Sequence, residues 1–104
     1  MSMETRAFRP IGATTTATAT AGSAVVTLPY TQGSRSVRIA NVGADHVNIE
    51  FGAGATVTAT TTASMLVLGN TVEVFSTPVG VDRVAVIAYS TTGSVVFIQC
   101  GEGV

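Results

Sequence analysis

The residues that could do chemistry in this chain are few, and the two most versatile, His46 and Cys100, are the only ones of their type. A histidine can act as an acid or a base near neutral pH, and a cysteine thiolate is a nucleophile and a metal ligand. A nucleophilic cysteine needs a base and an electropositive setting, and the sequence around Cys100 supplies neither. We therefore predict that Cys100 is a buried, unreactive thiol in an apolar strand.

His46 begins the clearest alternating segment of the chain, and Glu50 follows on the same face. Four residues of extended strand separate the two side chains by about 13 Å, so they cannot form a catalytic pair on that strand. Two interpretations of His46 stay open. It is either a solvated strand residue or a histidine that senses pH or contacts a partner.

Other patterns also lack the partners that chemistry requires. Asp82 and Arg83 are neighbours at the start of a strand, where adjacent side chains face opposite sides, so we expect no ion pair between them. The glycine-rich stretches at 52–54 and 101–103 lack the lysine and the helix of a phosphate-binding loop. One cysteine and one histidine exclude a multi-cysteine or histidine-rich metal site. We predict no enzyme activity, no catalytic or metal-binding residue and no cofactor.

The charge of the chain argues against further classes of function. Charged residues make up 11% of the 104 residues, against roughly a quarter in ordinary globular domains. The formal net charge is −1, so no basic surface exists to neutralise phosphates, and we expect no nucleic-acid partner. No apolar run is long enough to cross a membrane, so we expect no membrane partner either.

The cations also carry information, because all five are arginines and no lysine occurs. Arginine is the charged residue that stays enriched in protein interfaces, and free monomers usually carry more charge for solubility. The composition therefore favours a protein that lives in contact with copies of itself or with another protein. A high-GC genome is an alternative reason for the missing lysine, but it accounts less well for the 17 threonines.

β-Strands must position these residues, because 17 threonines and 16 valines, both β-branched, dominate the 104 residues. No segment keeps a 3.6-residue period, so we expect no helix beyond a single turn. Segments with strand patterns recur about every 8–12 residues, with turn residues between them. This spacing predicts an all-β fold, a single antiparallel β-sandwich of about eight strands.

Several segments carry more specific predictions. Ser36–Val42 and His46–Phe51 alternate between apolar and polar residues around a tight turn, so we predict a hairpin with one buried and one solvated face. The pattern of Met65–Leu68 predicts a short buried strand. Arg83–Tyr89 and Ser94–Cys100 are apolar on both faces, which is typical of central strands.

We divide the chain into an N-terminal arm, residues 1–23, and a β-sandwich domain, residues 24–104. The Thr/Ala run that ends the arm is either a flexible tether or an extended strand that pairs along an edge. Ahead of it lie Arg6, Phe8 and Arg9, which we predict as partner contacts made by strand addition, with Phe8 as the anchor. The alternative is a frayed terminus without a binding role.

A resemblance to a known group rests on five segments of residues 24–104, namely Ser36–Gly43, His46–Gly52, Glu73–Phe75, Val84–Ala88 and Gly101–Gly103. Together they resemble the small β-rich structural proteins of tailed bacteriophages, most of all capsid decoration, or cement, proteins. The resemblance implies a jelly-roll-like sandwich on the capsid surface of the virion. It implies a homo-oligomer, a dimer or trimer, that binds the major capsid protein, stabilises the shell and takes no small-molecule substrate.

Two other functions stay open. The first is a tail, fibre or head–tail module of a virion with the same sandwich. Its location on the particle would distinguish it from a capsid decoration protein. The second is a carbohydrate-binding β-sandwich. Such sites usually present aromatic platforms to sugar rings, and this chain has no tryptophan and only Tyr30 and Tyr89 as tyrosines.

Overall fold

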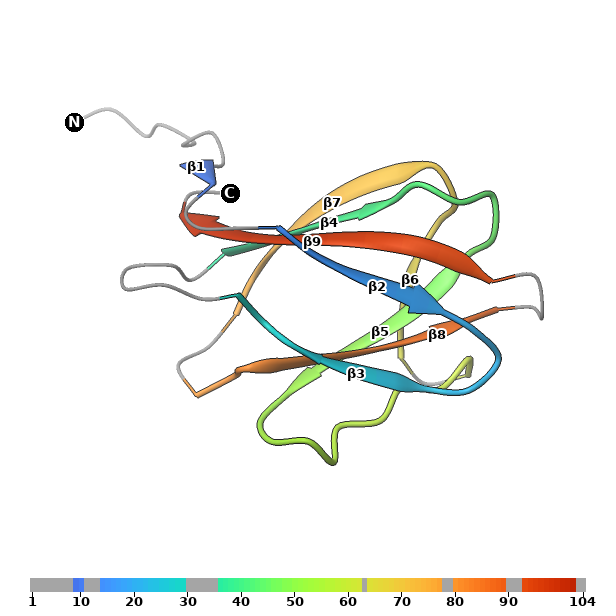
Figure 1. The fold of residues 1–104 in the computed structure, drawn as a ribbon, viewed down its shortest axis with the longest axis horizontal. Coiled ribbons are helices and arrows are strands. Elements are labelled where there is room, and N and C mark those ends of the chain that lie inside the picture. The colour runs from blue at the N-terminus through green and yellow to red at the C-terminus, as the bar shows by residue number, and fades with distance from the viewer. Residues whose placement is uncertain are drawn as a thin grey trace.

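The computed structural model describes residues 9–10, 14–29, 36–62, 64–77, 80–89 and 93–102, with the backbone alone for Arg9. These residues form nine β-strands and no helix (Figure 1), so the all-β prediction is confirmed. Among them there is accordingly no helix of membrane-spanning length and hydropathy. The strands are β1 (Arg9–Pro10), β2 (Thr15–Ala19), β3 (Ala24–Thr27), β4 (Ser36–Asn41), β5 (Val47–Gly52), β6 (Met65–Val67), β7 (Thr71–Ser76), β8 (Arg83–Ala88) and β9 (Ser94–Glu102).

Sheet A is built around β9, the longest described strand. β4 pairs with one edge of β9, and β7 pairs with the far side of β4. The other edge of β9 pairs first with β2 and then, towards its end, with β1. Since β1 and β2 follow one another along this edge, they fill a single strand position. Of the two forms open to the Thr/Ala run, Thr15–Ala19 takes the paired strand.

Sheet B has the order β3-β8-β5-β6, and its neighbours are antiparallel. The prediction that Arg83–Tyr89 and Ser94–Cys100 provide central strands is confirmed by the positions of β8 and β9. The prediction of a buried strand at Met65–Leu68 is wrong. β6 lies at the edge of sheet B, where only β5 supports it, so Met65, Leu66 and Leu68 are exposed and Val67 alone is fully buried.

The strands pair from the two ends of the chain inward, as in one long hairpin that folds over into two sheets. β2 pairs with β9, β3 with β8, β4 with β7 and β5 with β6, each antiparallel. Closing the roll adds the β4–β9 and β5–β8 pairs, which join the strands into two sheets. This order defines a jelly roll, a double sheet of eight strand positions. The predicted antiparallel sandwich with a jelly-roll-like arrangement is therefore confirmed.

One predicted pairing is wrong, because Ser36–Val42 and His46–Phe51 do not form a hairpin. β4 belongs to sheet A and β5 to sheet B, so the connection between them crosses from one sheet to the other. Ile39 and Ile49 nevertheless lie in the same core, as their alternation requires. Alternation determines which side of a strand is buried, but it does not determine which strand lies beside it.

The core fills the space between the two sheets with alternate side chains of their strands. Ala17 and Ala19 of β2 belong to this core, so the Thr/Ala run contributes to it. Phe51 and Phe75 pack edge to face, with ring centroids 5.6 Å apart, and lie against the buried cluster. The fully buried apolar side chains of the core include Val37, Ile39, Val47, Val67, Val84, Val86, Val96 and Ile98.

The connection between β5 and β6 lies against the outer side of sheet B, below the sheet in Figure 1. The Asn48 side-chain amide donates to the Ser64 carbonyl (2.9 Å), and the Ser64 hydroxyl donates to Glu50 (3.0 Å). The Ala59 amide donates to the Ser23 hydroxyl at 2.9 Å. Since Ser23 precedes β3, the connection reaches from one edge of sheet B to the other. Ala85 of β8 points away from the core and is still fully buried.

Candidate interaction surface

One side of sheet A is turned away from the core, and we call it the outer face. Because Val96 and Ile98 of β9 point into the core, Val95 and Phe97 point outward. The strand register then places one row of outward side chains across four strands, in the order Thr16, Phe97, Ala40 and Val72. The described side chains of the outer face are Thr16, Thr18, Ser36, Arg38, Ala40, Val42, Val72, Val74, Ser76, Val95, Phe97 and Gln99.

Much of the outer face is apolar and open to solvent. Phe97 and Val95 are each 39% exposed, Val72 is 50% exposed and Val42 is 55% exposed. Val42 continues the outward side of β4, and its amide donates to the Val95 carbonyl at 3.1 Å, so the two residues are neighbours. Contiguous apolar patches of this kind mark interaction sites on soluble proteins. The outer face is therefore the candidate binding surface.

Sequence reasoning assigned no binding role to these residues, although a signal was present. Ser94–Cys100 is apolar on both faces, which we interpreted as a sign of a central strand. β9 does have a strand at each edge, but only its inner side faces the opposite sheet. In an antiparallel sandwich the outer side of a central strand is normally solvated. Val95 and Phe97, which are apolar although they lie on the outer side of the strand, could therefore have indicated a binding surface.

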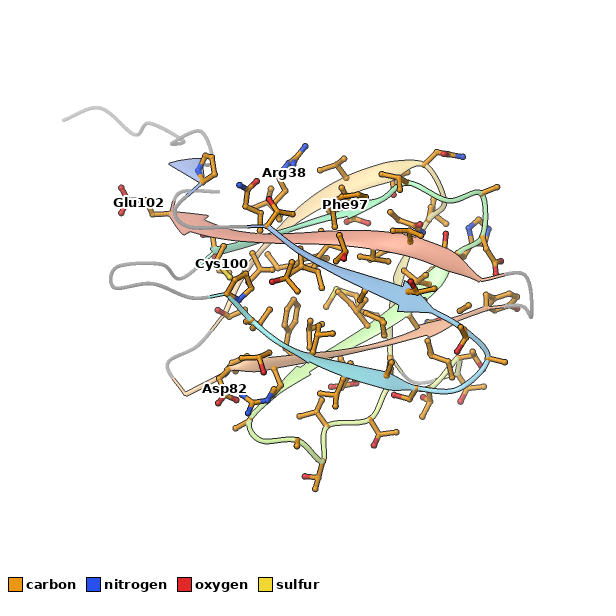
Figure 2. The ribbon with its side chains drawn as sticks, in the orientation of Figure 1. Arg38, Asp82, Phe97, Cys100 and Glu102 are labelled. Carbon is orange, nitrogen blue, oxygen red and sulfur yellow. The ribbon has the colours of Figure 1, made fainter. Side chains whose placement is uncertain are left out.

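Arg38 is the charged side chain of the outer face. In the register it lies between Gln99 of β9 and Val74 of β7, one row beyond Phe97. Its side chain is half-buried, and it makes no hydrogen bond or ion pair that involves the described part of the chain. Figure 2 shows Arg38 and Phe97 on the same side of β9. An unpaired guanidinium beside an apolar patch is a ready donor for a carboxylate.

Of the three predicted contact residues of the arm, the structure describes only the backbone of Arg9. Arg6 and Phe8 lie outside the described residues. The backbone of Arg9 forms β1, opposite Glu102 of β9, and Pro10 lies opposite Gly101. Gly101 is two residues along β9 from Gln99, so β1 adjoins the end of the outer face that also carries Arg38.

His46 lies just outside the strand in which we predicted it, because β5 begins at Val47. Its Nδ1 accepts a hydrogen bond from the Gly69 amide at 3.1 Å, which joins two connections at one end of the sandwich. The ring centroid of His46 lies 6.3 Å from that of Tyr89, which is 61% exposed. The described contacts of His46 are therefore structural, and sequence spacing gave no sign of its Gly69 partner.

Asn41 holds the same end of the sandwich together from the inside. Its side-chain amide donates to the carbonyls of Asp45 (2.9 Å) and Leu68 (3.2 Å). Its Oδ1 accepts from the Ser94 hydroxyl (2.7 Å) and the Gly43 amide (3.2 Å). Asn41 is 1% exposed, and a buried polar network with its partners in place rigidifies what surrounds it. The network ties β4 and β9, the two inner strands of sheet A, to the neighbouring connections.

The thiol of Cys100 is free and fully buried, as predicted. Burial raises the pKa of this thiol from 9.0 to about 11, because the protein interior disfavours the thiolate. Near neutral pH the folded protein therefore holds the protonated thiol, which is a poor nucleophile. Within the described residues no group of three or more histidine, cysteine, aspartate or glutamate side chains is placed to hold a metal ion.

The prediction that Asp82 and Arg83 do not pair is wrong. Arg83 Nη1 lies 2.8 Å from Asp82 Oδ2. Asp82 precedes β8, so the alternation of the strand does not govern its side chain, and the long arginine side chain reaches back to it. Asp82 also accepts a hydrogen bond from the Gly54 amide at 3.1 Å. Because the Asp82 side chain is 52% exposed, we expect this ion pair to fix a turn rather than to do chemistry.

Comparisons with protein-family models, with curated proteins and with solved structures found no match to this chain. Three features of the chain therefore bear on its function: the jelly roll, the exposed apolar side chains of the outer face and the low content of charged residues.

Proposed function

We propose that the protein is a structural component of a bacteriophage virion, a capsid decoration protein that binds the outside of the shell through the outer face of sheet A. The observation that carries the proposal is the exposed apolar face around Phe97, on a chain in which only 11% of residues are charged. The resemblance of residues 24–104 to decoration proteins favours the same function. The proposal assigns the protein no catalytic role, substrate or cofactor.

A sheet face suits binding by burial of a preformed surface. Transfer of the exposed parts of Val72, Val95 and Phe97 from water contributes about 25 cal/mol for each Å² buried. One small face gives modest affinity, and symmetric copies on a shell raise it through their effective concentration. A dimer or trimer seated on a local symmetry axis, bridging neighbouring copies of the major capsid protein, is part of the proposal.

The arm enters the proposal through Arg6, Phe8 and Arg9 as additional contacts. β1 pairs with β9 at one end of the outer face, so the chain enters the sandwich beside the proposed binding surface. Deleting residues 1–8 keeps β2, with the core residues Ala17 and Ala19, in place. We expect this deletion to weaken shell binding and to leave the unfolding transition unchanged. Unchanged binding would remove Arg6 and Phe8 from the binding surface.

Co-sedimentation tests the proposed function. Purified protein is mixed with expanded capsid shells of the parent phage that lack it and, separately, with tails from the same particle. We expect saturable binding to shells at a fixed ratio to capsid subunits. Binding to tails alone would instead assign the protein to the tail, fibre or head–tail class. Binding to neither would overturn a virion role, and a glycan panel would then test the carbohydrate-binding alternative.

A further inference from the structure

The outer face of sheet A carries a single sign of charge. Among the side chains that the structure describes on this face, Arg38 is the charged one. Glu73 points to the opposite side of β7 from Val72 and Val74. The other acidic residues that the structure describes also lie off this face, and they are Asp45, Glu50, Asp82 and Glu102.

This pattern disfavours a symmetric pairing of two outer faces. In an interface with two-fold symmetry the same patch lies on both subunits, so each side chain of the patch meets another residue of that patch. Arg38 would then be covered without a carboxylate to receive it. Burial of a charge without a partner is strongly destabilising, so an occupant of this face has to bring the missing carboxylate.

We propose that the outer face docks onto a different protein, whose apolar surface presents an aspartate or glutamate to Arg38. This inference rests on the proposed function and names the partner chemistry that the proposed function requires. The guanidinium can grip a carboxylate with two parallel hydrogen bonds. Phe97, diagonally adjacent to Arg38 in the register, excludes water from that pair once the face is covered. The apolar residues supply area, and Arg38 sets the orientation of the partner.

Another surface of a second copy is a poorer source of the carboxylate. Glu50 accepts a hydrogen bond from Ser64, and Asp82 is paired with Arg83. Asp45 and Glu102 already interact within the chain. Glu73 is exposed on β7, the edge strand of sheet A, and its side chain points away from the side of β7 that carries Val72 and Val74. Of the acidic residues that the structure describes, four already have partners within the chain and Glu73 stands at the edge of the sheet, so we take a different protein as the source of the carboxylate. Glu4 lies outside the described residues.

The test compares the wild type with three variants. Phe97→Ser removes the apolar centre of the face, Arg38→Gln removes its charge, and Arg83→Gln is the matched arginine control outside the face. Shell binding is measured by co-sedimentation over a range of protein concentrations, and thermal unfolding verifies that each variant is folded. We expect Arg38→Gln and Phe97→Ser each to lower the affinity for shells by roughly 30-fold or more, the effect of breaking a desolvated contact pair. Arg83→Gln should bind as the wild type does.

The outcomes separate this inference from the proposed function. Wild-type binding to shells that neither Arg38→Gln nor Phe97→Ser weakens would overturn the inference and the assignment of the outer face as the binding surface, and it would leave the decoration role itself standing. Failure of the wild type to bind shells or tails would overturn both. The molar mass of the free protein, measured by light scattering, tests whether a second copy of the chain occupies the outer face. A dimer that Phe97→Ser dissociates would show that a second copy occupies the face, and it would overturn the inference.

Discussion

The outer sides of the two sheets differ, although each lies over a central strand that is apolar on both faces. On sheet B the connection between β5 and β6 lies over the strands, and Ala85 of β8 is fully buried beneath it. On sheet A the corresponding residues of β9, Val95 and Phe97, are each 39% exposed.

The comparison shows where the chain completes its own fold and where it leaves a surface for another molecule. Strands β8 and β9 both require apolar residues on the inner side to build the core. On the outer side, the chain covers β8 with its own β5–β6 connection, held by Asn48, Ser64 and Ser23. No described segment covers β9 in the same way. The bare side is therefore the one to which we assign the binding role.

The largest expected difference is between the two sides of β9, measured as the stability lost when one side chain on each side is truncated. Ile98→Ala should lower the free energy of unfolding by about 2–5 kcal/mol, because Ile98 is fully buried and its truncation leaves a cavity. Phe97→Ala, one residue away, should cost about 1–2 kcal/mol, because its side chain is 39% exposed and truncation on the open side leaves no closed cavity. Urea unfolding, with the denaturant slope checked for each variant, measures both. Equal losses would contradict the assignment of the outer side as a free surface.

The inner side of β9 also makes a prediction about pH. Burial raises the pKa of Cys100 from 9.0 to about 11, so between these values the unfolded chain loses the thiol proton and the folded protein keeps it. The stability that the thiol contributes is present below pH 9 and falls as the pH approaches 11, by roughly 1–3 kcal/mol. Urea unfolding at pH 8, 9, 10 and 11 should show this fall in the wild type and a smaller one in Cys100→Ala. Parallel curves for the two proteins would show that the inner side admits water.

The smallest expected effect concerns the cover of sheet B. The hydroxyl of Ser64 accepts from the Thr60 amide (2.9 Å) and donates to Glu50 (3.0 Å), so Ser64→Ala removes both contacts. We expect a loss of about 0.5–1.5 kcal/mol. Amide hydrogen exchange should become faster at 53–62 and stay unchanged in β9. Ser76→Ala, an exposed serine on β7, is the control. Faster exchange throughout the sandwich would show that the connection is part of the core rather than a cover.

Much of the fold could be predicted from local pattern, because a period of two identifies a strand and its two sides. Alternation in Ser36–Val42 placed Arg38 and Ala40 together on the side away from the core, which the structure confirms. The same pattern could not show that β4 and β5 belong to different sheets. That follows from strand pairings between residues far apart in the chain, β4 with β9 and β5 with β8.

The candidate surface was harder to predict than the fold. Strand patterns identify apolar outer residues such as Val95 and Phe97, but the cover over a strand comes from distant segments. No local pattern indicates that the β5–β6 connection reaches Ser23 and covers sheet B alone. The arm residues Arg6 and Phe8 remain a prediction, since they lie outside the described residues. The pairing of Asp82 with Arg83 was missed because Asp82 precedes β8.

The most direct test of the central claim is cysteine labelling in assembled particles. The native thiol is buried, so an introduced cysteine supplies the reactive site. Val72→Cys places it on the outer face of sheet A, and Ala55→Cys places it on the exposed connection that covers sheet B. In free protein both variants should react rapidly with a maleimide. On the shell we predict that the thiol at position 72 is protected and the thiol at position 55 still reacts. A reactive thiol at position 72 on the shell would contradict the account.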